Sequence, residues 1–149
     1  VATPKHLHRV KLLDEAVNDY GSLINQQLSM AMQKVVILPF AYIMDKFRYD
    51  VFRGNVEPEN ANCHFWRLRE KHSGIGPASK RSNRDFDITA KFHASADVEY
   101  MRYFVSNIIQ FQFHKAACIK AGEYEPHNPA KSLYNCDIYN SANAGNAIK

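Results

Sequence analysis

The chain has 149 residues, 46% of them hydrophobic and 23% charged, which is typical of a globular domain and not of a disordered chain. Its formal charge of +4 comes from 19 basic and 15 acidic residues scattered along the sequence. No basic run is longer than the pair Lys80–Arg81, so the charge does not indicate nucleic-acid binding. The most apolar run, Val35–Met44, is far shorter than the roughly 20 residues that cross a bilayer, so no transmembrane segment is predicted.

The first half of the chain predicts two helices. Residues 1–5 carry no signal-peptide pattern, and a mature or cut N-terminus is as compatible with them as a cytosolic start. Thr3 followed by Pro4 is a helix start, which predicts a short helix from Pro4 to about Leu13. After a break at Gly21–Ser22, apolar residues recur at steps of three and four as far as Phe52. Pro39 lies inside this run and predicts a kink, and Gly54 predicts the end of the helix.

The second half predicts further helices and almost no strand. A shorter helix is expected over residues 61–71, followed by a loop over 73–87 that is rich in Ser, Gly, Pro, Asn and charged residues. A second strong helix is expected over 98–121, ended by Gly122, and a last one begins near Ser141. The predicted fold class is therefore all-α.

The predicted helix over residues 98–121 has two different faces. One face is an apolar stripe of Met101, Phe104, Val105, Ile108 and Ile109. The other is a polar and aromatic stripe of Tyr100, Tyr103, Asn107, Gln110 and His114. For the polar and aromatic stripe, spacing alone favours a partly wetted surface, and the wall of a cleft is the alternative.

The three cysteines, Cys63, Cys118 and Cys136, have no spacing typical of a zinc site. They are compatible with three buried thiols. They are equally compatible with one disulfide and an odd cysteine whose partner lies outside this chain. Composition does not decide between the two.

Six segments of the chain carry a specific pattern. They are Ala2–Leu7 (ATPKHL), Leu38–Lys46 (LPFAYIMDK), Asp87–His93 (DITAKFH), Tyr100–Ser106 (YMRYFVS), Gln110–His114 (QFQFH) and Cys136–Tyr139 (CDIY). In the same order and at similar spacing, these segments resemble those of the angiotensin-converting enzyme family, particularly its soluble invertebrate members. The resemblance covers essentially the whole chain.

This resemblance implies a large, two-lobed helical ellipsoid with a deep central cleft and a zinc ion at its base. Such enzymes release dipeptides from the free C-terminus of peptides and hold zinc through two His of an HExxH helix and a downstream Glu. None of the seven His here is followed by Glu, so the chain has no HExxH and is assigned no metal ligand. Residues 1–149 are thus expected to be a partial catalytic domain, truncated at both ends, that needs the remainder of the domain.

The resemblance also assigns substrate-binding and catalytic residues. Lys91 and Tyr100 match a cation and a phenol that hold the substrate's C-terminal carboxylate, a suitable pair for an anion that needs charge and direction. His93 matches a donor to a substrate carbonyl, and Tyr103 a donor that stabilises the oxyanion. Read alone, Lys91 would be a surface lysine, His93 a structural histidine and Tyr103 a half-buried helix tyrosine.

Two arginines match ligands of bound chloride ions. These are Arg102 and Arg69, and a pairing of either with a carboxylate is the alternative. We expect the Arg102 site to be the better preserved, because Phe65 stands where the family usually places a tryptophan in the Arg69 site.

The pocket for the substrate's C-terminal side chain departs from the family pattern. Ile37 and Asn107 stand where the family usually has aromatic residues, whereas Phe40 keeps one aromatic wall. Altered specificity is therefore expected in this pocket. A homologue that binds peptides but cleaves them poorly is the alternative.

By the same resemblance, Cys118 and Cys136 match a family disulfide, which implies a secreted or extracellular protein. Cys63 would then be free or paired elsewhere. The sequence thus predicts the substrate-binding half of a zinc peptidyl dipeptidase that is inactive by itself. The alternatives are an inactive peptide-binding or structural homologue and, without the resemblance, a helical interaction module with a closed core and no cleft.

Overall fold

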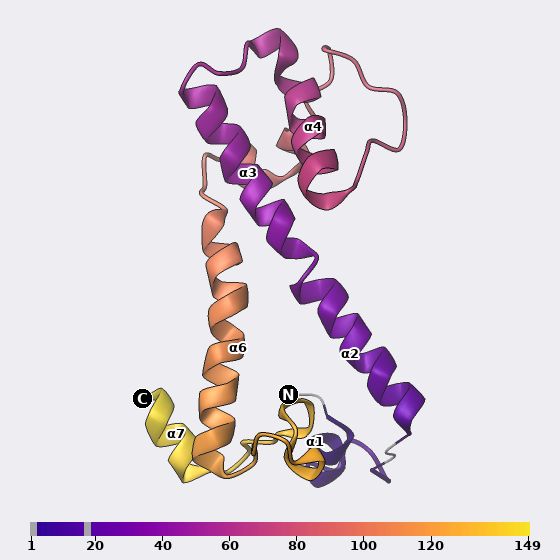
Figure 1. Ribbon diagram of the computed structural model, residues 1–149, viewed down its shortest axis with the longest axis vertical. Coiled ribbons are helices and arrows are strands. Elements are labelled where there is room, and N and C mark those ends of the chain that lie inside the picture. Colours follow the sequence, from indigo (N-terminus) through magenta and orange to yellow (C-terminus); the bar gives the residue numbers. More distant parts are fainter. Residues whose placement is uncertain (1–2, 17–18) are drawn as a thin grey trace. The chain divides into compact units, whose positions relative to one another are not determined.

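The computed structural model describes residues 3–16 and 19–149 (Figure 1). Ala2, the first residue of the segment Ala2–Leu7, lies outside this range. Over the described residues the regular elements are helices and short 3-10 turns, with no strand, which confirms the all-α class. The elements are α1 (Pro4–Arg9), α2 (Tyr20–Lys34), α3 (Ile37–Phe52), η1 (Pro58–Asn60), α4 (Ala61–Ser73), η2 (Asp87–Ala90), α5 (Phe92–Ser95), α6 (Met101–Ala121), η3 (Pro129–Lys131), η4 (Leu133–Asn135) and α7 (Ala142–Ile148).

The chain divides into two compact units. A central unit comprises residues 31–107, and a terminal unit comprises residues 1–30 together with 108–149. Helices α2 and α6 contribute to both units. All the residues predicted to touch substrate or chloride lie in the central unit, and the predicted disulfide lies in the terminal unit.

The long predicted helix is interrupted rather than merely kinked. Helices α2 and α3 are separated by Val35 and Val36, four and three residues before Pro39. Pro39 has no N–H for the Val35 carbonyl, and its ring would collide with that carbonyl in a continuous helix. The Val35 carbonyl instead accepts the N–H of Leu38, at 3.0 Å. The proline was therefore the right signal, and its effect falls one turn upstream.

The run Tyr20–Phe52 contains an 18-residue stretch with a mean hydropathy of 1.2, so by length and composition it could cross a membrane. This is weak evidence, because core helices of soluble proteins meet the same criterion. The α3 half of the run carries Asp45, Lys46, Arg48 and Asp50, which pair with one another and with neighbouring residues. Ion pairs at this density favour a helix packed in a protein over one in lipid.

The hydrophobic core of the central unit is built by α3 and α4, which lie side by side (Figure 1), with contributions from η2 and the start of α6. The α3 side chains that enter this core follow helical spacing. The core residues are Ala41, Ile43, Met44, Phe47, Ala61, Phe65, Leu68, Ile88 and Tyr100.

The apolar stripe predicted on residues 98–121 is only partly covered. Phe104 packs against the central core, whereas Val105 is 46% exposed. Leu28 and Met32 on α2 are also largely exposed. The described residues therefore do not enclose their apolar surface in a single closed core, contrary to what the helical interaction module predicts.

Asp50 ties α3 to α4 from a buried position, 5% exposed. Lys46 Nζ lies 2.6 Å from both of its carboxylate oxygens, and His64 Nε2 lies 3.0 Å from Oδ2. Burial alone would raise the pKa of Asp50, but the hydrogen bonds and charges of Lys46 and His64 outweigh it and lower the pKa. Asp50 is therefore ionised in the folded protein at neutral pH.

We expect the Asp50 carboxylate to steepen the loss of folding stability as the pH falls. Because its folded pKa is below its unfolded pKa of about 3.9, its contribution is complete above that value and is lost as pH falls through the folded pKa. Asp50→Asn should lower the thermal midpoint of the complete protein at pH 7, and the difference from wild type should shrink towards pH 3. Thermal melts across this range test it, and a difference that stays constant with pH contradicts it.

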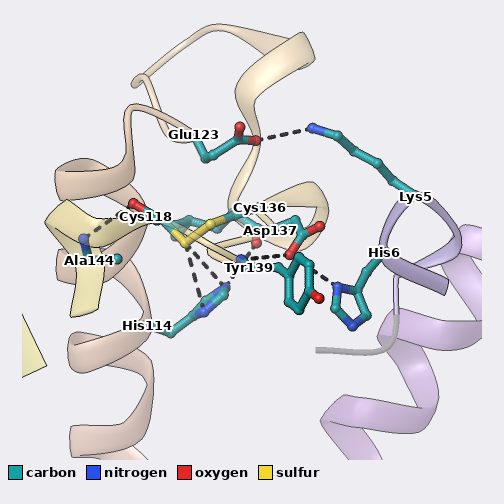
Figure 2. Close-up of a disulfide and its surroundings, with 11 residues drawn as sticks. Lys5, His6, His114, Cys118, Glu123, Cys136, Asp137, Tyr139 and Ala144 are labelled. Carbon is teal, nitrogen blue, oxygen red and sulfur yellow. Dashed lines mark hydrogen bonds and ion pairs between the residues drawn. A yellow bond between two sulfur atoms is a disulfide. The ribbon is translucent and has the colours of Figure 1, made fainter. Parts of the chain in front are cut away.

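The disulfide between Cys118 and Cys136 anchors the terminal unit (Figure 2). Both cysteines are fully buried, and Cys63 is an exposed free thiol, so one disulfide and an odd cysteine is the correct alternative. The His114 ring nitrogens lie 3.6 and 3.8 Å from Cys118 Sγ. Thiolates bind metals, and these two sulfurs are bonded to each other, so the group of His114 and two cysteines offers no metal site while the disulfide is intact.

Asp137, which follows Cys136, joins α1 to the C-terminal segment. Its carboxylate lies 3.1 Å from His6 Nδ1 and accepts the N–H of Tyr139 (Figure 2). The carboxylate also lies 3.1 Å from Arg9 Nη1. Thr3 Oγ1 accepts the N–H of His6, as the predicted helix start requires. Helix α1 ends at Arg9 instead of near Leu13, because the chain turns at Val10 and continues through left-handed Lys11.

Candidate functional site

The candidate site is built around Tyr100, which is only 4% exposed. Three rings from three helices surround it: Phe40 of α3, His93 of α5 and Tyr103 of α6, with centroids 5.6, 4.9 and 4.6 Å from that of Tyr100. The Phe40 and His93 rings meet Tyr100 edge to face, an arrangement that aromatic pairs favour. The site residues therefore rest directly on the core of the central unit.

Lys91 lies beside Tyr100. Its Nζ is 5.5 Å from the centroid of the Tyr100 ring, within the range of a cation–π contact. Lys91 has extended backbone geometry and immediately precedes α5. A cation and a phenol are thus brought together from positions nine residues apart.

His93 and Tyr103 are hydrogen-bonded to each other, with 3.0 Å between His93 Nε2 and the Tyr103 hydroxyl. The other ring nitrogen, His93 Nδ1, is buried and has no hydrogen-bond partner among the described residues. If Nε2 carries the ring hydrogen, it donates to the phenol oxygen and leaves the phenol hydrogen available to another acceptor. The pair can therefore supply a hydrogen-bond donor, the phenol hydrogen.

Asn107 lies one turn after Tyr103 on α6. Its amide nitrogen donates to the Tyr103 carbonyl at 2.7 Å. The side chain thus turns back onto its own helix, a local bond that a phenylalanine in this position could not make.

The remaining predicted pocket residues, Ile37 and Phe40, line a shallow hollow of about 290 Å³ together with Arg69 and Ser73. Asn107 is not part of its lining. Phe40 contacts the Tyr100 ring and also lines the hollow. Ile37 lines the same hollow, whereas Asn107 does not, so the described residues do not bring Ile37 and Asn107 into one pocket.

Arg69 has the surroundings of an anion ligand. Its guanidinium lies 5.1, 6.0 and 5.8 Å from the ring centroids of Phe40, Phe65 and Trp66. Its pKa lies below the usual value because burial disfavours the charged form. Arg69 Nε and Ser73 Oγ are both buried without a partner among the described residues. Two unsatisfied donors beside a hollow fit an anion such as chloride.

Arg102 is in a more open place. Its side chain is 49% exposed, lies over the Tyr103 ring and is 3.7 Å from Glu99. A chloride ligand and a carboxylate pair are both compatible with this geometry. In the described residues the burial and the unsatisfied donors favour Arg69, although the sequence favoured Arg102.

Sequence reasoning missed Asp45, whose buried carboxylate accepts the N–H groups of Tyr100 and Met101 at the start of α6. The available signal was a lone acidic residue at the end of an apolar run. It also missed α5, whose four residues carry His93 and are too few to show helical periodicity.

The whole chain, residues 1–149, matches the family described as angiotensin-converting enzyme. It is 56% identical over 145 residues to an angiotensin-converting enzyme of Haematobia irritans exigua, covering 97% of this chain and 24% of the relative. It is 47% identical over 148 residues to an angiotensin-converting enzyme-related protein of Drosophila melanogaster, covering 99% and 24%. The Mus musculus enzyme is 46% identical over 149 residues, covering 100% of this chain and 11% of its own.

These matches show that the chain is part of a protein of a peptidase family. It belongs to the angiotensin-converting enzyme family, peptidase family M2. It spans about a quarter of the length of the insect relatives. The resemblance read from its six segments is therefore confirmed.

Proposed function

We propose that this chain is the substrate-binding half of a zinc peptidyl dipeptidase, which releases dipeptides from the free C-terminus of peptides in a secreted or extracellular setting. The observation that carries the proposal is the grouping of Lys91, His93 and Tyr103 around the buried ring of Tyr100. Membership in a peptidase family and the disulfide support it.

Lys91 and Tyr100 select the substrate by its C-terminal carboxylate. The ammonium supplies charge and the phenol hydroxyl supplies a directed hydrogen bond. Because both groups lie at one place, the carboxylate sets which peptide bond is cut. A peptide whose C-terminus is an amide lacks the charge and should bind poorly.

His93 and Tyr103 act on the scissile region. A peptide carbonyl accepts a hydrogen bond from the His93 ring, and the Tyr103 hydroxyl donates to the oxygen that gains negative charge in the transition state. When bound, zinc would be held by residues outside this chain and would supply an activated water. The bond between His93 and Tyr103 is exchanged for bonds to substrate.

Arg69 and Arg102 bind chloride in this proposal, and Arg69 has the stronger physical basis because its burial leaves donors unsatisfied. The exposed apolar side chains of α2 and α6 are covered by the remainder of the catalytic domain.

In the decisive experiment, the complete zinc-loaded protein is incubated with two matched peptides, one with a free C-terminus and one with an amidated C-terminus. Mass spectrometry should show dipeptide release from the free acid and a rate at least about a hundredfold lower for the amide. The 149-residue chain with added zinc should release nothing. Equal rates on both peptides, or stepwise release of single residues, would refute the proposal.

An inactive peptide-binding or structural homologue is the second candidate, and the polar Asn107 in a pocket position that the family fills with an aromatic residue favours it. The two functions differ in the rest of the polypeptide. An intact HExxH and downstream Glu favour the enzyme, and substituted zinc ligands favour the binding protein.

Asn107→Phe should restore an aromatic wall. In the complete protein we expect the KM for substrates ending in Phe or Trp to fall by several-fold, because a ring gains apolar contact that an amide lacks. Substrates ending in Gly are the control and should change little. Steady-state kinetics on the matched peptides measure this, and an equal effect on both would contradict it.

A further inference from the structure

The first turn of α6 is held by a carboxylate from another helix. Asp45 of α3 is 3% exposed, and both its oxygens lie 3.0 Å from the Tyr100 backbone nitrogen. Its Oδ2 also lies 2.6 Å from the Met101 nitrogen. The first N–H groups of a helix have no partner within the helix, and a negative charge at that end is favourable. Asp45 thus acts as the cap that Tyr100, with its aromatic side chain, does not supply.

The Asp45 carboxylate is itself fixed. Arg48, one turn further along α3 and mostly buried, donates through Nη2 to Asp45 Oδ1 at 2.9 Å. Its other terminal nitrogen donates to Asp97 Oδ1 at 3.1 Å, just before the start of α6. A planar guanidinium that spans two carboxylates restricts both. Helix α3 and the residues leading into α6 therefore form one hydrogen-bonded unit.

This contact determines where the two tyrosines lie. Tyr100 is the residue whose N–H Asp45 accepts, and the Tyr103 N–H donates to the Tyr100 carbonyl at 3.0 Å. Phe40, on the same helix as Asp45, contacts the Tyr100 ring. The backbone of Tyr100 and one face of its ring are thus both fixed by α3. A loss of the cap frees the α6 start and, with it, both hydroxyl groups.

We infer that Asp45 is a positioning residue of the peptidase, which orients Tyr100 and Tyr103 through the backbone of α6 without touching the substrate. The inference rests on the function proposed above for these tyrosines. Small displacements of groups that act on a transition state lower the rate by large factors. Loss of the Asp45 carboxylate should therefore lower kcat as well as folding stability.

The test is Asp45→Asn in the complete zinc-loaded protein, with Asp50→Asn as the matched control. Asp50 lies on the same helix, is similarly buried and is also held by a cation, but its second contact is His64 of α4 and not α6. Both variants should lower the thermal midpoint. Asp45→Asn should also lower kcat by about tenfold or more, whereas Asp50→Asn should leave kcat within about twofold.

Hydrogen exchange provides a reading that does not depend on activity. The amides of Tyr100 and Met101 should exchange at least about tenfold faster in Asp45→Asn than in wild type. In Asp50→Asn their exchange rates should equal those of wild type. Arg48→Gln removes the cation that holds the carboxylate and should give an intermediate increase, which keeps the test open if Asp45→Asn does not fold.

Two results would overturn the inference. One is unchanged exchange at residues 100 and 101 in both Asp45→Asn and Arg48→Gln. The other is an equal loss of kcat in Asp45→Asn and Asp50→Asn, which would make Asp45 an ordinary stabilising residue. A wild-type protein that releases no dipeptides refutes the proposed function instead, while the exchange data still decide whether Asp45 holds α6.

Discussion

Tyr103→Phe in the complete zinc-loaded protein should lower kcat by about 10²- to 10³-fold and change KM by less than about threefold. The substitution removes one oxygen and keeps the ring, so the contacts with Tyr100 and His93, at 4.6 and 5.4 Å between centroids, are retained. A hydroxyl that donates only to the developing oxyanion contributes to the transition state and not to substrate binding. The loss should therefore appear in kcat.

Steady-state kinetics with a dipeptide-releasing substrate measure this effect, and Tyr49→Phe is the control. Tyr49 is an exposed tyrosine of α3, away from the cluster around Tyr100, and its loss of a hydroxyl should leave kcat unchanged. If Tyr103→Phe keeps kcat within about threefold of wild type, Tyr103 does not stabilise the oxyanion. A rise in KM with unchanged kcat would assign it to ground-state binding instead.

Local signals in the sequence predicted most helix ends. Thr3 caps α1, Ser141 caps α7 through the Ala144 N–H, and Gly54 and Gly122 follow α3 and α6 with positive φ. These signals depend on one or two neighbouring residues, because a cap bonds within one turn and left-handed backbone favours glycine. They are therefore readable without knowledge of the fold.

The site itself was predictable only through the family resemblance. Lys91 and His93 have no distinctive pattern by themselves, and their grouping with Tyr100 depends on α5, a helix of four residues. The Asp45 cap joins positions 55 residues apart, which no local pattern reports. Likewise, periodicity identified an apolar face on α6 but not what covers it, and Val105 remains half exposed in this chain. The features that the sequence did not predict are those that depend on contacts between residues distant in sequence. The features that it predicted depend on local propensity.

Replacing both Cys118 and Cys136 with alanine should lower the free energy of unfolding by about 3 kcal/mol, because the bond closes an 18-residue step and restricts the unfolded chain. The effect should extend to α1. Asp137 follows Cys136 and holds His6 (Figure 2), and it also holds Arg9. A freed residue 136 therefore loosens the carboxylate that binds the N-terminal helix.

Urea unfolding of the complete protein, with and without a dithiol reductant, tests the disulfide prediction. Cys63→Ser is the matched control, because Cys63 is exposed and has no disulfide partner among the described residues. The double variant should unfold at lower urea concentration than wild type, and reductant should shift wild type towards it while leaving the double variant unchanged. Cys63→Ser should behave as wild type in both conditions. An equal midpoint for wild type and the double variant without reductant would mean that the bond restricts little of the unfolded chain. Faster amide exchange in α1 of the double variant alone would show that the disulfide acts on the N-terminal helix through Asp137.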